Sequence, residues 1–217
     1  MKVSAIIPVK NPSTSKMRLS SFLSSFERER LTLEMLKDII YALSSCKLVS
    51  NIVIVSPGDE IKRADYVKNV FFVKDKGEGQ IKAVRKGLRY ATDVLNSEAV
   101  IVIVADAPLV KPSEICKIVK LGSMWRTVVL VPSSDGGTNI IFQHPPNIIP
   151  LRYGRNSFRK HLEEAVKRKL NVIVYSSSTT SLDVDVLEDL KQVLTLGGET
   201  FTYKFVSEVF RNKRTFS

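Results

Sequence analysis

The acidic residues best suited to bind a cation lie at two points far apart in the chain. Asp106 comes directly after the apolar run AVIVIVA at 99–105, and Asp183 and Asp185 lie two residues apart in SLDVDVLEDL. In an extended segment such a pair points to one face, where two carboxylates repel each other unless a cation lies between them. Oxygen ligands with no His or Cys near them in sequence indicate Mg²⁺ rather than Zn²⁺. We therefore predict that these three aspartates bind a divalent cation for chemistry on a nucleotide.

Asp185 also has a structural interpretation. With Glu188 three residues later, it resembles the N-cap of a helix and its reciprocal acid. That helix would carry its apolar side chains at Leu187, Leu190, Val193 and Leu194. The stretch alone does not decide between a helix cap and a cation ligand.

A basic loop follows the first apolar run of the chain. In KNPSTSKMRLS at 10–20, the cations Lys10, Lys16 and Arg18 are interleaved with small hydroxyl residues and a proline. This composition suits a loop that wraps a polyphosphate with cations and backbone amides. A solvated basic loop without a ligand is the alternative.

The segment SSDGGTN at 133–139 could contact a ligand. Its consecutive glycines would let the backbone approach closely, and the polar side chains of Thr138 and Asn139 could orient the bound molecule. A plain hairpin turn is the competing interpretation.

The segment RYGRNSF at 152–158 offers a second candidate. Gly154 and Ser157 precede a helical pattern, and the N-terminus of that helix could hold a phosphate. Asn156 or Ser157 would also serve as a simple cap of the same helix.

Familiar nucleotide-binding and zinc motifs are missing from the sequence. It contains no GxxxxGK[ST], and GEGQIK at 77–82 lacks a third glycine and does not follow the first strand pattern. His144 and His161 have no partner at metal-ligand spacing, which favours structural or surface roles for both. Trp125 and the tyrosines are not interleaved with the basic residues, which argues against a base-stacking surface for nucleic acid.

The overall charge and the two cysteines limit the partners and the compartment. Lys and Arg number 33 against 22 Asp and Glu, and the net charge of +11 favours an anionic partner such as nucleic acid, a membrane surface or a phosphorylated small molecule. No segment approaches the roughly 20 apolar residues of a membrane span. Cys46 and Cys116 lack CxxC spacing, so we expect two reduced thiols in a cytoplasmic protein.

The positioning elements follow from hydrophobic patterns. Continuous β-branched runs indicate strands that are covered on both faces, as in a mostly parallel sheet. These runs are VSAIIPV (3–9), NIVIVS (51–56), VFFV (70–73), AVIVIVA (99–105), TVVLVP (127–132), TNIIF (138–142) and NVIVY (171–175). TVVLVP and TNIIF, joined by SSDGG, break the strand–helix rhythm and predict a hairpin or an excursion at the sheet edge.

Helical patterns lie between several of these strands. Apolar residues repeat at intervals of three and four over 31–43 and 158–166, and Pro112 suits the first turn of a further helix. We therefore predict one α/β domain over 1–217, with helices on both faces of the sheet and right-handed crossovers. The tail at 204–217 is expected to be a basic helix that frays into solvent. Ligands of open α/β sheets bind at the carboxyl ends of the strands, where Asp106 falls.

Taken in order, the motifs resemble those of the 2-phospho-L-lactate guanylyltransferase family, which activates a phosphorylated three-carbon acid in the biosynthesis of the deazaflavin coenzyme F-420. The matching segments are IPVK at 7–10, SKMRLS at 15–20, ERERL at 27–31, DKGEG at 75–79, ADAPL at 105–109, DGGTN at 135–139, YGRNSFRKH at 153–161 and DVD at 183–185. They span nearly all of residues 3–190. Each motif is weak singly, and their joint order is what makes the resemblance specific.

The resemblance implies a glycosyltransferase-A-like, Rossmann-like nucleotidyltransferase fold with one metal-dependent site at the carboxyl edge of the sheet. By the same resemblance, Asp106, Asp183 and Asp185 look like the Mg²⁺ ligands. The residues that look like the cradle of the acceptor are Thr138, Asn139, Gly154 and Ser157. The residues that look like nucleotide contacts are Lys10, Lys16, Arg18, Asp75 and Gly79.

The chain departs from the family pattern at three places. GQIKAV replaces GLNEAL, so Ile81 stands where an asparagine is expected to meet the nucleotide, and Gln80 or Lys82 could take over that contact. Ala107 replaces the leucine of ADLPL, and DVDTP appears as DVDVL. The acidic positions are unchanged.

The implied reaction is transfer of GMP from GTP to 2-phospho-L-lactate with release of pyrophosphate. Phosphoenolpyruvate or 3-phosphoglycerate as the acceptor, or another nucleoside triphosphate as the donor, would suit the same fold. The alternatives from other classes are a basic nucleic-acid-binding protein and a sugar-nucleotide glycosyltransferase. We expect small phosphorylated partners rather than nucleic acid or a membrane, and a homodimer formed through the hairpin or the C-terminal helix.

Overall fold

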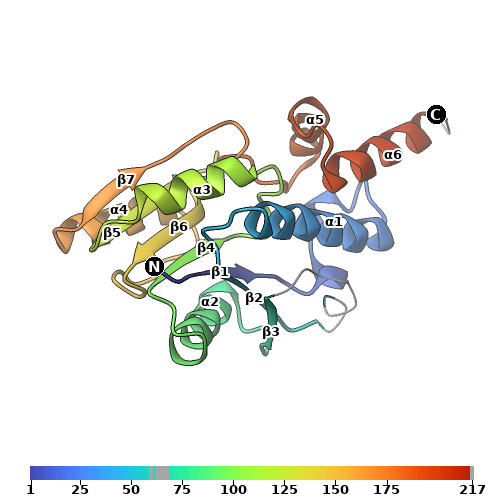
Figure 1. Cartoon of the computed structure of the whole chain (residues 1–217). Coiled ribbons are helices and arrows are strands. Elements are labelled where there is room, and N and C mark those ends of the chain that lie inside the picture. The colour runs from blue at the N-terminus through green and yellow to red at the C-terminus, as the bar shows by residue number, and fades with distance from the viewer. Residues whose placement is uncertain (59–60, 62–68, 216–217) are drawn as a thin grey trace.

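A seven-stranded sheet forms the centre of the computed structural model, which describes residues 1–58, 61 and 69–215 (Figure 1). Each of the seven Val- and Ile-rich runs forms a strand, so the strand prediction is confirmed. The strands are β1 (Val3–Pro8), β2 (Asn51–Ser56), β3 (Val70–Lys74), β4 (Ala99–Ile103), β5 (Thr127–Pro132), β6 (Thr138–His144) and β7 (Asn171–Val174). They are ordered β3-β2-β1-β4-β6-β5-β7.

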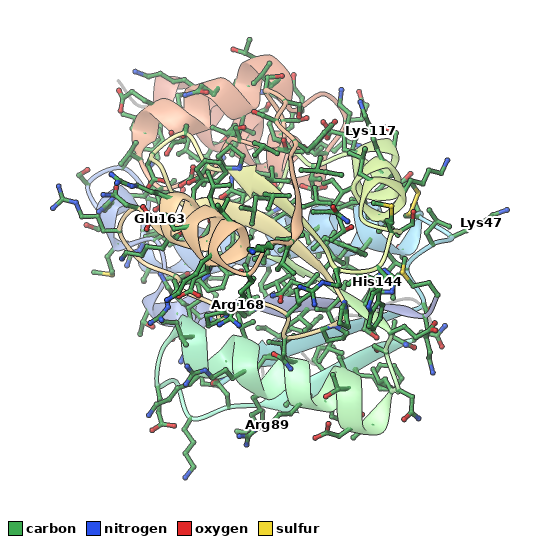
Figure 2. The ribbon with its side chains drawn as sticks, turned by 90° about the vertical axis from the view of Figure 1, so that its left-hand side faces the viewer. Lys47, Arg89, Lys117, His144, Glu163 and Arg168 are labelled. Carbon is green, nitrogen blue, oxygen red and sulfur yellow. A yellow bond between two sulfur atoms is a disulfide. The ribbon has the colours of Figure 1, made fainter. Side chains whose placement is uncertain are left out.

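Helices cover both faces of the sheet. They are α1 (Ser25–Ser44), α2 (Gln80–Arg89), α3 (Pro112–Leu121) and α4 (Ser157–Lys167), with the short helical turns η1 (Pro12–Thr14), η2 (Met17–Leu19) and η4 (Tyr90–Val94). Figure 2 shows Lys117 of α3 on one side of the sheet and Arg89 of α2 on the other. The predicted α/β architecture is therefore confirmed.

Neighbouring residues of one strand face opposite helical layers. In β1, the side chain of Ile7 packs into the core formed with α1 and α3, whereas that of Ile6 packs into the core formed with α2 and α4. Ile6 pairs with Val53 on one side and Val102 on the other. Burial of both faces explains why these strands read as unbroken apolar runs rather than as alternating ones.

Strand β6 runs antiparallel to both of its neighbours, β4 and β5. The predicted hairpin of β5 and β6 is therefore confirmed. The alternative, an excursion at the sheet edge, is wrong, because β6 lies inside the sheet and β7 extends it beyond β5. The turn between β5 and β6 consequently lies at the same edge as the carboxyl ends of β1 and β4.

Two C-terminal helices, α5 (Leu187–Leu196) and α6 (Phe201–Thr215), form a third apolar cluster with the first half of α1. Phe205, Val206 and Val209 of α6 are buried in it. A carboxylate of α1 holds the start of α6, since both oxygens of Asp38 accept hydrogen bonds of 2.8 Å from the backbone amides of Phe201 and Thr202. The expected C-terminal helix is present. The prediction that it frays from residue 204 is wrong, because its apolar face packs against α1 and α5.

A disulfide joins Cys46, just after α1, to Cys116 of α3, with a Cα–Cα distance of 5.6 Å. The expectation of two reduced thiols is therefore wrong. Both helices cover the same face of the sheet, which brings together two cysteines 70 residues apart in sequence. Reduced thiols would have supported a cytoplasmic location, so the cysteines no longer provide an argument for this compartment.

Among the described residues, none of the helices combines the length and the apolar character that a membrane span requires.

Candidate active site

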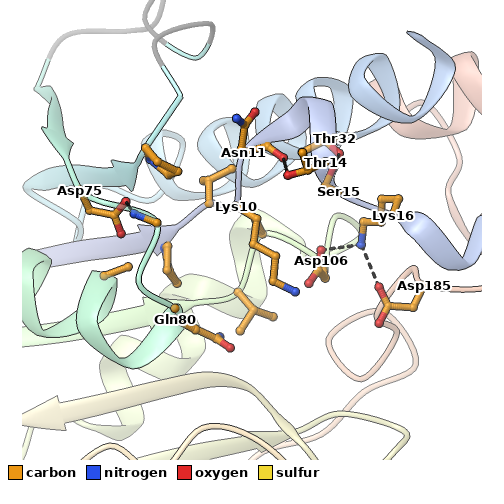
Figure 3. Close-up of a pocket in the computed structure, with 18 residues that line it drawn as sticks. Lys10, Asn11, Thr14, Ser15, Lys16, Thr32, Asp75, Gln80, Asp106 and Asp185 are labelled. Atoms are coloured by element: carbon orange, nitrogen blue, oxygen red, sulfur yellow. Dashed lines mark hydrogen bonds and ion pairs between the residues drawn. The ribbon is translucent and has the colours of Figure 1, made fainter. Parts of the chain in front are cut away.

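A cavity of about 270 Å³ opens at the carboxyl edge of the sheet. Its walls come from the loop after β1, the segment before and within the first turn of α2, the residues after β4, and Asp185. Figure 3 shows Asp75 and Gln80 toward one end, Lys16, Asp106 and Asp185 toward the other, and Lys10 between them. The cavity therefore brings together acids and cations that are far apart in the sequence.

Lys16 lies between the two acidic segments at one end of the cavity. Its Nζ donates to Oδ1 of Asp106 at 2.5 Å, to the carbonyl oxygen of Val184 at 2.5 Å and to Oδ1 of Asp185 at 3.1 Å. The Lys16 side chain is only 4% exposed, whereas those of Asp106 and Asp185 are 35% and 43% exposed. The three oxygens thus converge on one buried cation.

The ion pair fixes the charge states of its members. Burial alone would lower the pKa of Lys16, but the charges of Asp106 and Asp185 hold it above its ordinary value. Burial would raise the pKa of Asp106, yet the Lys16 charge and hydrogen bond bring it below its ordinary value. Lys10, on the cavity wall, acts on Asp106 in the same direction. Lys16 is therefore an ammonium and Asp106 a carboxylate at neutral pH.

The loop after β1 holds Lys16 in an unusual backbone conformation. Its φ of 55° and ψ of 37° lie in the left-handed region, which a long side chain seldom adopts. Next to it, the buried Ser15 hydroxyl bonds to the hydroxyl of Thr32 in α1 at 2.6 Å, and Asn11 caps η1. The predicted basic loop is thus anchored to α1, with Lys16 turned inward and Arg18 exposed.

The second acidic segment is attached directly to the first. The backbone N–H of Val184 donates to the carbonyl oxygen of Asp106 at 2.9 Å. Asp189, not Asp185, caps α5, because its Oδ2 accepts from the backbone amides of Asp185 and Val186 at 2.8 Å. The helix-cap interpretation of Asp185 is therefore wrong, and its carboxylate bonds to Lys16 instead.

Glu114, in the first turn of α3, holds the loop that leads to these aspartates. Its buried carboxylate accepts from the Ser177 hydroxyl at 2.5 Å, from the Thr179 hydroxyl at 2.9 Å and from the backbone N–H of Lys111 at 2.8 Å. Sequence reasoning missed this residue. Its only local signal was its place as the third residue of the helix that begins at Pro112, where an acid commonly caps a helix.

Asp183 lies beside the Lys16 cluster rather than within it. It accepts a hydrogen bond of 3.3 Å from the Ser134 hydroxyl. Burial, followed by the charges of Asp135 and Asp185, raises the pKa of Asp183 to about 6. Asp183 is thus near enough to Asp185 for their charges to interact, whereas the common face for both side chains stays a prediction. A strongly perturbed carboxylate beside a cavity is a common mark of a functional site.

Thr138 and Ser157 form a buried hydroxyl pair at the start of β6 and α4. The Ser157 hydroxyl donates to Oγ1 of Thr138 at 3.3 Å, and Nδ1 of His161 lies 3.0 Å from the same oxygen. Nε2 of His161 accepts from the backbone N–H of Arg152 at 2.8 Å, so a neutral ring carries its proton on Nδ1 and donates it to Thr138. Burial lowers the pKa of His161 to about 4, so the ring is neutral. Thr138 accepts both bonds and keeps its own proton to donate.

The remaining acceptor-side candidates differ in their surroundings. The Asn139 amide is buried and donates to the carbonyl oxygen of Thr180 at 3.0 Å, so it holds the 177–181 loop. Gly154, at φ 113°, has open space around its Cα. Asn156 precedes α4 without a side-chain cap bond, so the cap interpretation of Asn156 finds no support in the structure. None of these three residues lines the cavity.

The opposite end of the cavity is formed by the start of α2. Asp75 Oδ1 accepts from the backbone N–H of Gly77 at 2.9 Å, and Gly79 precedes the helix with φ 99°, a conformation that favours glycine. Gln80 lines the cavity. Ile81 instead lines a separate groove beside α4, so only Gln80 is placed to replace the asparagine contact. Lys82 is exposed and paired with Glu78.

The oxygens around Lys16 suit a hard cation. Mg²⁺ in nucleotide enzymes is usually held by one or two carboxylates together with substrate phosphates, rather than by a cage made of protein alone. Asp106 and Asp185 provide two such carboxylates at one point. Across the residues that the structure describes, no group of three or more His, Cys, Asp or Glu side chains is arranged to hold a metal. The residues present therefore fit an ion that shares its ligands with a substrate, and three aspartate ligands stay a prediction.

Comparison with solved structures supports the fold. A structure from Desulfovibrio desulfuricans G20, described as a nucleotide-diphospho-sugar transferase, superposes with a TM-score of 0.81 at 19% identity and covers 98% of both chains. A nucleotidyl transferase from Methanothermobacter superposes with a TM-score of 0.65 at 14% identity, covering 88% of this chain and 95% of that one. At these identities the likeness concerns the fold alone.

Comparison with curated protein sequences identifies the family. The chain is 41% identical over 207 residues to 2-phospho-L-lactate guanylyltransferase of Methanocaldococcus fervens, covering 95% of this chain and 90% of that protein. It is 37% identical over 209 residues to the enzyme of the same name from Methanocaldococcus jannaschii, covering 96% and 90%. It is 28% identical over 201 residues to phosphoenolpyruvate guanylyltransferase of Thermobaculum terrenum, covering 91% and 85%. The profile of the family described as "Guanylyl transferase CofC like" matches residues 3–213, and this chain belongs to that guanylyltransferase family.

Proposed function

We propose that this protein transfers GMP from GTP to 2-phospho-L-lactate, giving lactyl-2-diphospho-5'-guanosine and pyrophosphate in coenzyme F-420 biosynthesis. The observation that carries the proposal is the identity of 37% to 41%, over nearly the whole chain, with relatives of that name. The cavity at the carboxyl edge, with cations and carboxylates side by side, provides a site of suitable chemistry.

In this proposal the nucleotide occupies the cavity. Asp75, Gly79 and Gln80 contact the nucleoside, while Lys10, Lys16 and Arg18 face the triphosphate. Asp106, Asp185 and the adjacent Asp183 are the residues that would hold Mg²⁺, which when bound neutralises charge on the phosphates and on the leaving pyrophosphate. The proton that Thr138 keeps would be donated to the acceptor, beside Ser157 and the open backbone at Gly154.

The acceptor needs no general base. A phosphate monoester has a second pKa of about 6 and is largely dianionic near neutral pH. Its oxygen attacks the α-phosphorus of GTP, the bond to the β-phosphate oxygen breaks, and pyrophosphate leaves with that electron pair. The main task of the protein is therefore to bring two polyanions together, which explains why the neutral His161 serves structure rather than proton transfer.

A second acceptor, phosphoenolpyruvate, is favoured by the name of the Thermobaculum terrenum relative. A pyrophosphate-release assay with GTP, ATP, CTP and UTP against 2-phospho-L-lactate, phosphoenolpyruvate and 3-phosphoglycerate separates the cases. We expect the highest kcat/KM for GTP with 2-phospho-L-lactate. A higher value for phosphoenolpyruvate would replace the acceptor, and no release with any pair would overturn the proposed function.

We also propose that the reaction takes place in the cytoplasm. The Cys46–Cys116 disulfide does not exclude this compartment, because intracellular proteins of hyperthermophilic archaea and bacteria are often disulfide-rich.

A further inference from the structure

We infer that the Lys16 ammonium occupies the cation position between Asp106 and Asp185, so that a divalent ion binds there only together with a triphosphate that draws Lys16 away. The inference rests on the proposed function and concerns the order in which its ligands bind. The ion and the nucleotide would then bind cooperatively, with Lys16 as the element that couples them.

The first support is the geometry around the ammonium. Three oxygens, from Asp106, Val184 and Asp185, lie between 2.5 and 3.1 Å from Nζ of Lys16. They come from segments 90 and more residues away in sequence, yet they surround one point. An ammonium has three protons to donate, and all three find an acceptor there. The position is therefore satisfied by a cation that belongs to the chain.

The second support is the backbone of Lys16 itself. Its left-handed conformation, with φ 55°, is unfavourable for a lysine and is retained because the buried side chain is held by both acids. Leaving this position would break the ion pairs with Asp106 and Asp185 but would release the strained backbone conformation. We therefore expect Lys16 to adopt a second conformation once its ammonium has another partner.

The third support is the position of the Lys16 ammonium on the wall of the cavity. Asp106, Lys16 and Asp185 all line the cavity, and Lys10 lines it from the side of β1. A divalent ion arriving alone would have to approach the ammonium at contact distance, and two cations at that distance repel strongly in a partly buried site. A triphosphate in the cavity removes this conflict, because its oxygens accept hydrogen bonds from Lys16 and also share the ion.

The test measures the affinity of the protein for Mn²⁺ under conditions without turnover. The concentration of free Mn²⁺ is monitored by its electron paramagnetic resonance signal. For the wild type, we expect Mn²⁺ to bind at least about tenfold more tightly with saturating α,β-methylene-GTP than without it, after correction for Mn²⁺ bound by free nucleotide. For Lys16→Met, we expect tight Mn²⁺ binding without nucleotide, at least about tenfold tighter than for the wild type.

The matched control is Lys191→Met, which removes an exposed cation that pairs with Glu188 on α5 and does not line the cavity. Its Mn²⁺ affinity without nucleotide should stay within about threefold of the wild type, well below the coupling expected at Lys16. Equal Mn²⁺ affinity of the wild type with and without the GTP analogue would overturn the inference. This comparison needs no variant, so it decides the matter even if Lys16→Met does not fold.

Failure of the inference and failure of the proposed function are distinguishable. Pyrophosphate release from GTP and 2-phospho-L-lactate, together with nucleotide-independent Mn²⁺ binding, would reject the inference alone. Nucleotide-dependent Mn²⁺ binding without any guanylyl transfer would support the role of Lys16 and reject the reaction.

Discussion

The backbone N–H of Val184 donates a hydrogen bond of 2.9 Å to the backbone carbonyl of Asp106. This single bond joins the segment after β4 to the segment before α5, and it places the carboxylates of Asp106 and Asp185 on either side of Lys16. The site is thus assembled by main-chain contact as well as by charge. Substitution of a side chain in it should therefore change chemistry more than it changes architecture.

Replacing Asp106 or Asp185 by asparagine should abolish most activity. Under the proposed function each change removes a charge that would hold Mg²⁺, and we expect kcat to fall by about 10² to 10³, as when other preorganised electrostatic contacts are lost. Initial rates of pyrophosphate release, with circular dichroism to verify folding, measure this. Asp93→Asn, at an exposed position after α2, should keep its activity. A folded Asp106→Asn variant with near-normal turnover would contradict the assignment.

Asp183→Asn should stabilise the protein at alkaline pH. Burial and the charges of Asp135 and Asp185 raise the pKa of Asp183 from 3.8 to about 6. Because the folded-state pKa exceeds that of the unfolded chain, the stabilising contribution of Asp183 is present below about pH 4 and is lost as the pH rises through about 6. We expect the variant to gain about 1 kcal/mol in unfolding free energy near pH 8, after allowance for partial exposure, and almost nothing near pH 4.

Urea unfolding of the wild type and Asp183→Asn at both pH values gives the comparison. Under the proposed function the same variant loses turnover. We therefore expect Asp183→Asn to gain stability and lose activity, as in a site where charge repulsion is kept because the reaction needs the charges. A stability difference that does not change with pH would argue against the raised pKa.

Glu114→Gln should impair catalysis although Glu114 does not line the cavity. An amide keeps only one acceptor oxygen, so the bonds from Ser177, Thr179 and the backbone of Lys111 cannot all persist. Loosening of the loop before Asp183 should lower kcat by about tenfold and raise the half-saturating Mg²⁺ concentration.

The control for Glu114 is Glu163→Gln, which breaks an exposed ion pair with Arg159 on the surface of α4. It should change neither kcat nor the half-saturating Mg²⁺ concentration. If Glu114→Gln lowers the melting temperature while turnover and Mg²⁺ requirement stay normal, Glu114 has a structural role only.

Gln80→Ala should weaken GTP binding, whereas Ile81→Ala should not. Gln80 lines the cavity, and Ile81 lines the groove beside α4. Loss of one side-chain hydrogen bond costs about 1 kcal/mol, so the KM for GTP should rise about fivefold with little change in kcat. Steady-state kinetics with GTP and ATP will show whether the preference for guanine falls as well. Equal effects of the two substitutions would remove Gln80 from the nucleotide contacts.

Reduction of the Cys46–Cys116 bond should lower the unfolding free energy. A cross-link that closes a loop of 70 residues is expected to contribute about 4 kcal/mol by restricting the unfolded chain. Guanidinium unfolding with and without reductant measures the loss, and Cys46→Ser/Cys116→Ser should show no further change with reductant. Two free thiols in the purified native protein, counted by alkylation and mass spectrometry, would contradict the bond.

The strands could be predicted because their signal is local. An apolar run such as AVIVIVA marks a buried strand without knowledge of its neighbours, and a proline such as Pro112 marks the start of a helix. Strand order is not a local property. Nothing within TNIIF indicates that β6 would be inserted between β4 and β5, because that position depends on how the whole sheet closes its core.

The composition of the site was predictable, but its internal pairing was not. The positions of Lys16, Asp106 and Asp185 at the ends of strands and loops pointed to one edge of the sheet. Lys16 binds Asp106 and Asp185, which are 90 and 169 residues away in sequence, and no local pattern indicates such contacts. The choice of Asp189 over Asp185 as the cap of α5, and the pairing of the cysteines, likewise follow from three-dimensional proximity.

The reversed direction of β6 has a consequence for how the site can be altered. Its tight turn at 133–137 reaches the edge that carries Asp106 without needing a crossover helix, and the backbone N–H of Phe158 at the start of α4 contacts it through Gly136. The sequence of this turn is constrained, since Gly136 has φ 85°, which favours glycine, and the backbone N–H of Ser134 donates to the carbonyl oxygen of Ser181. Under the proposed function, substitutions within this turn would therefore change the wall that meets the incoming acid, while the strands and the nucleotide half stay intact.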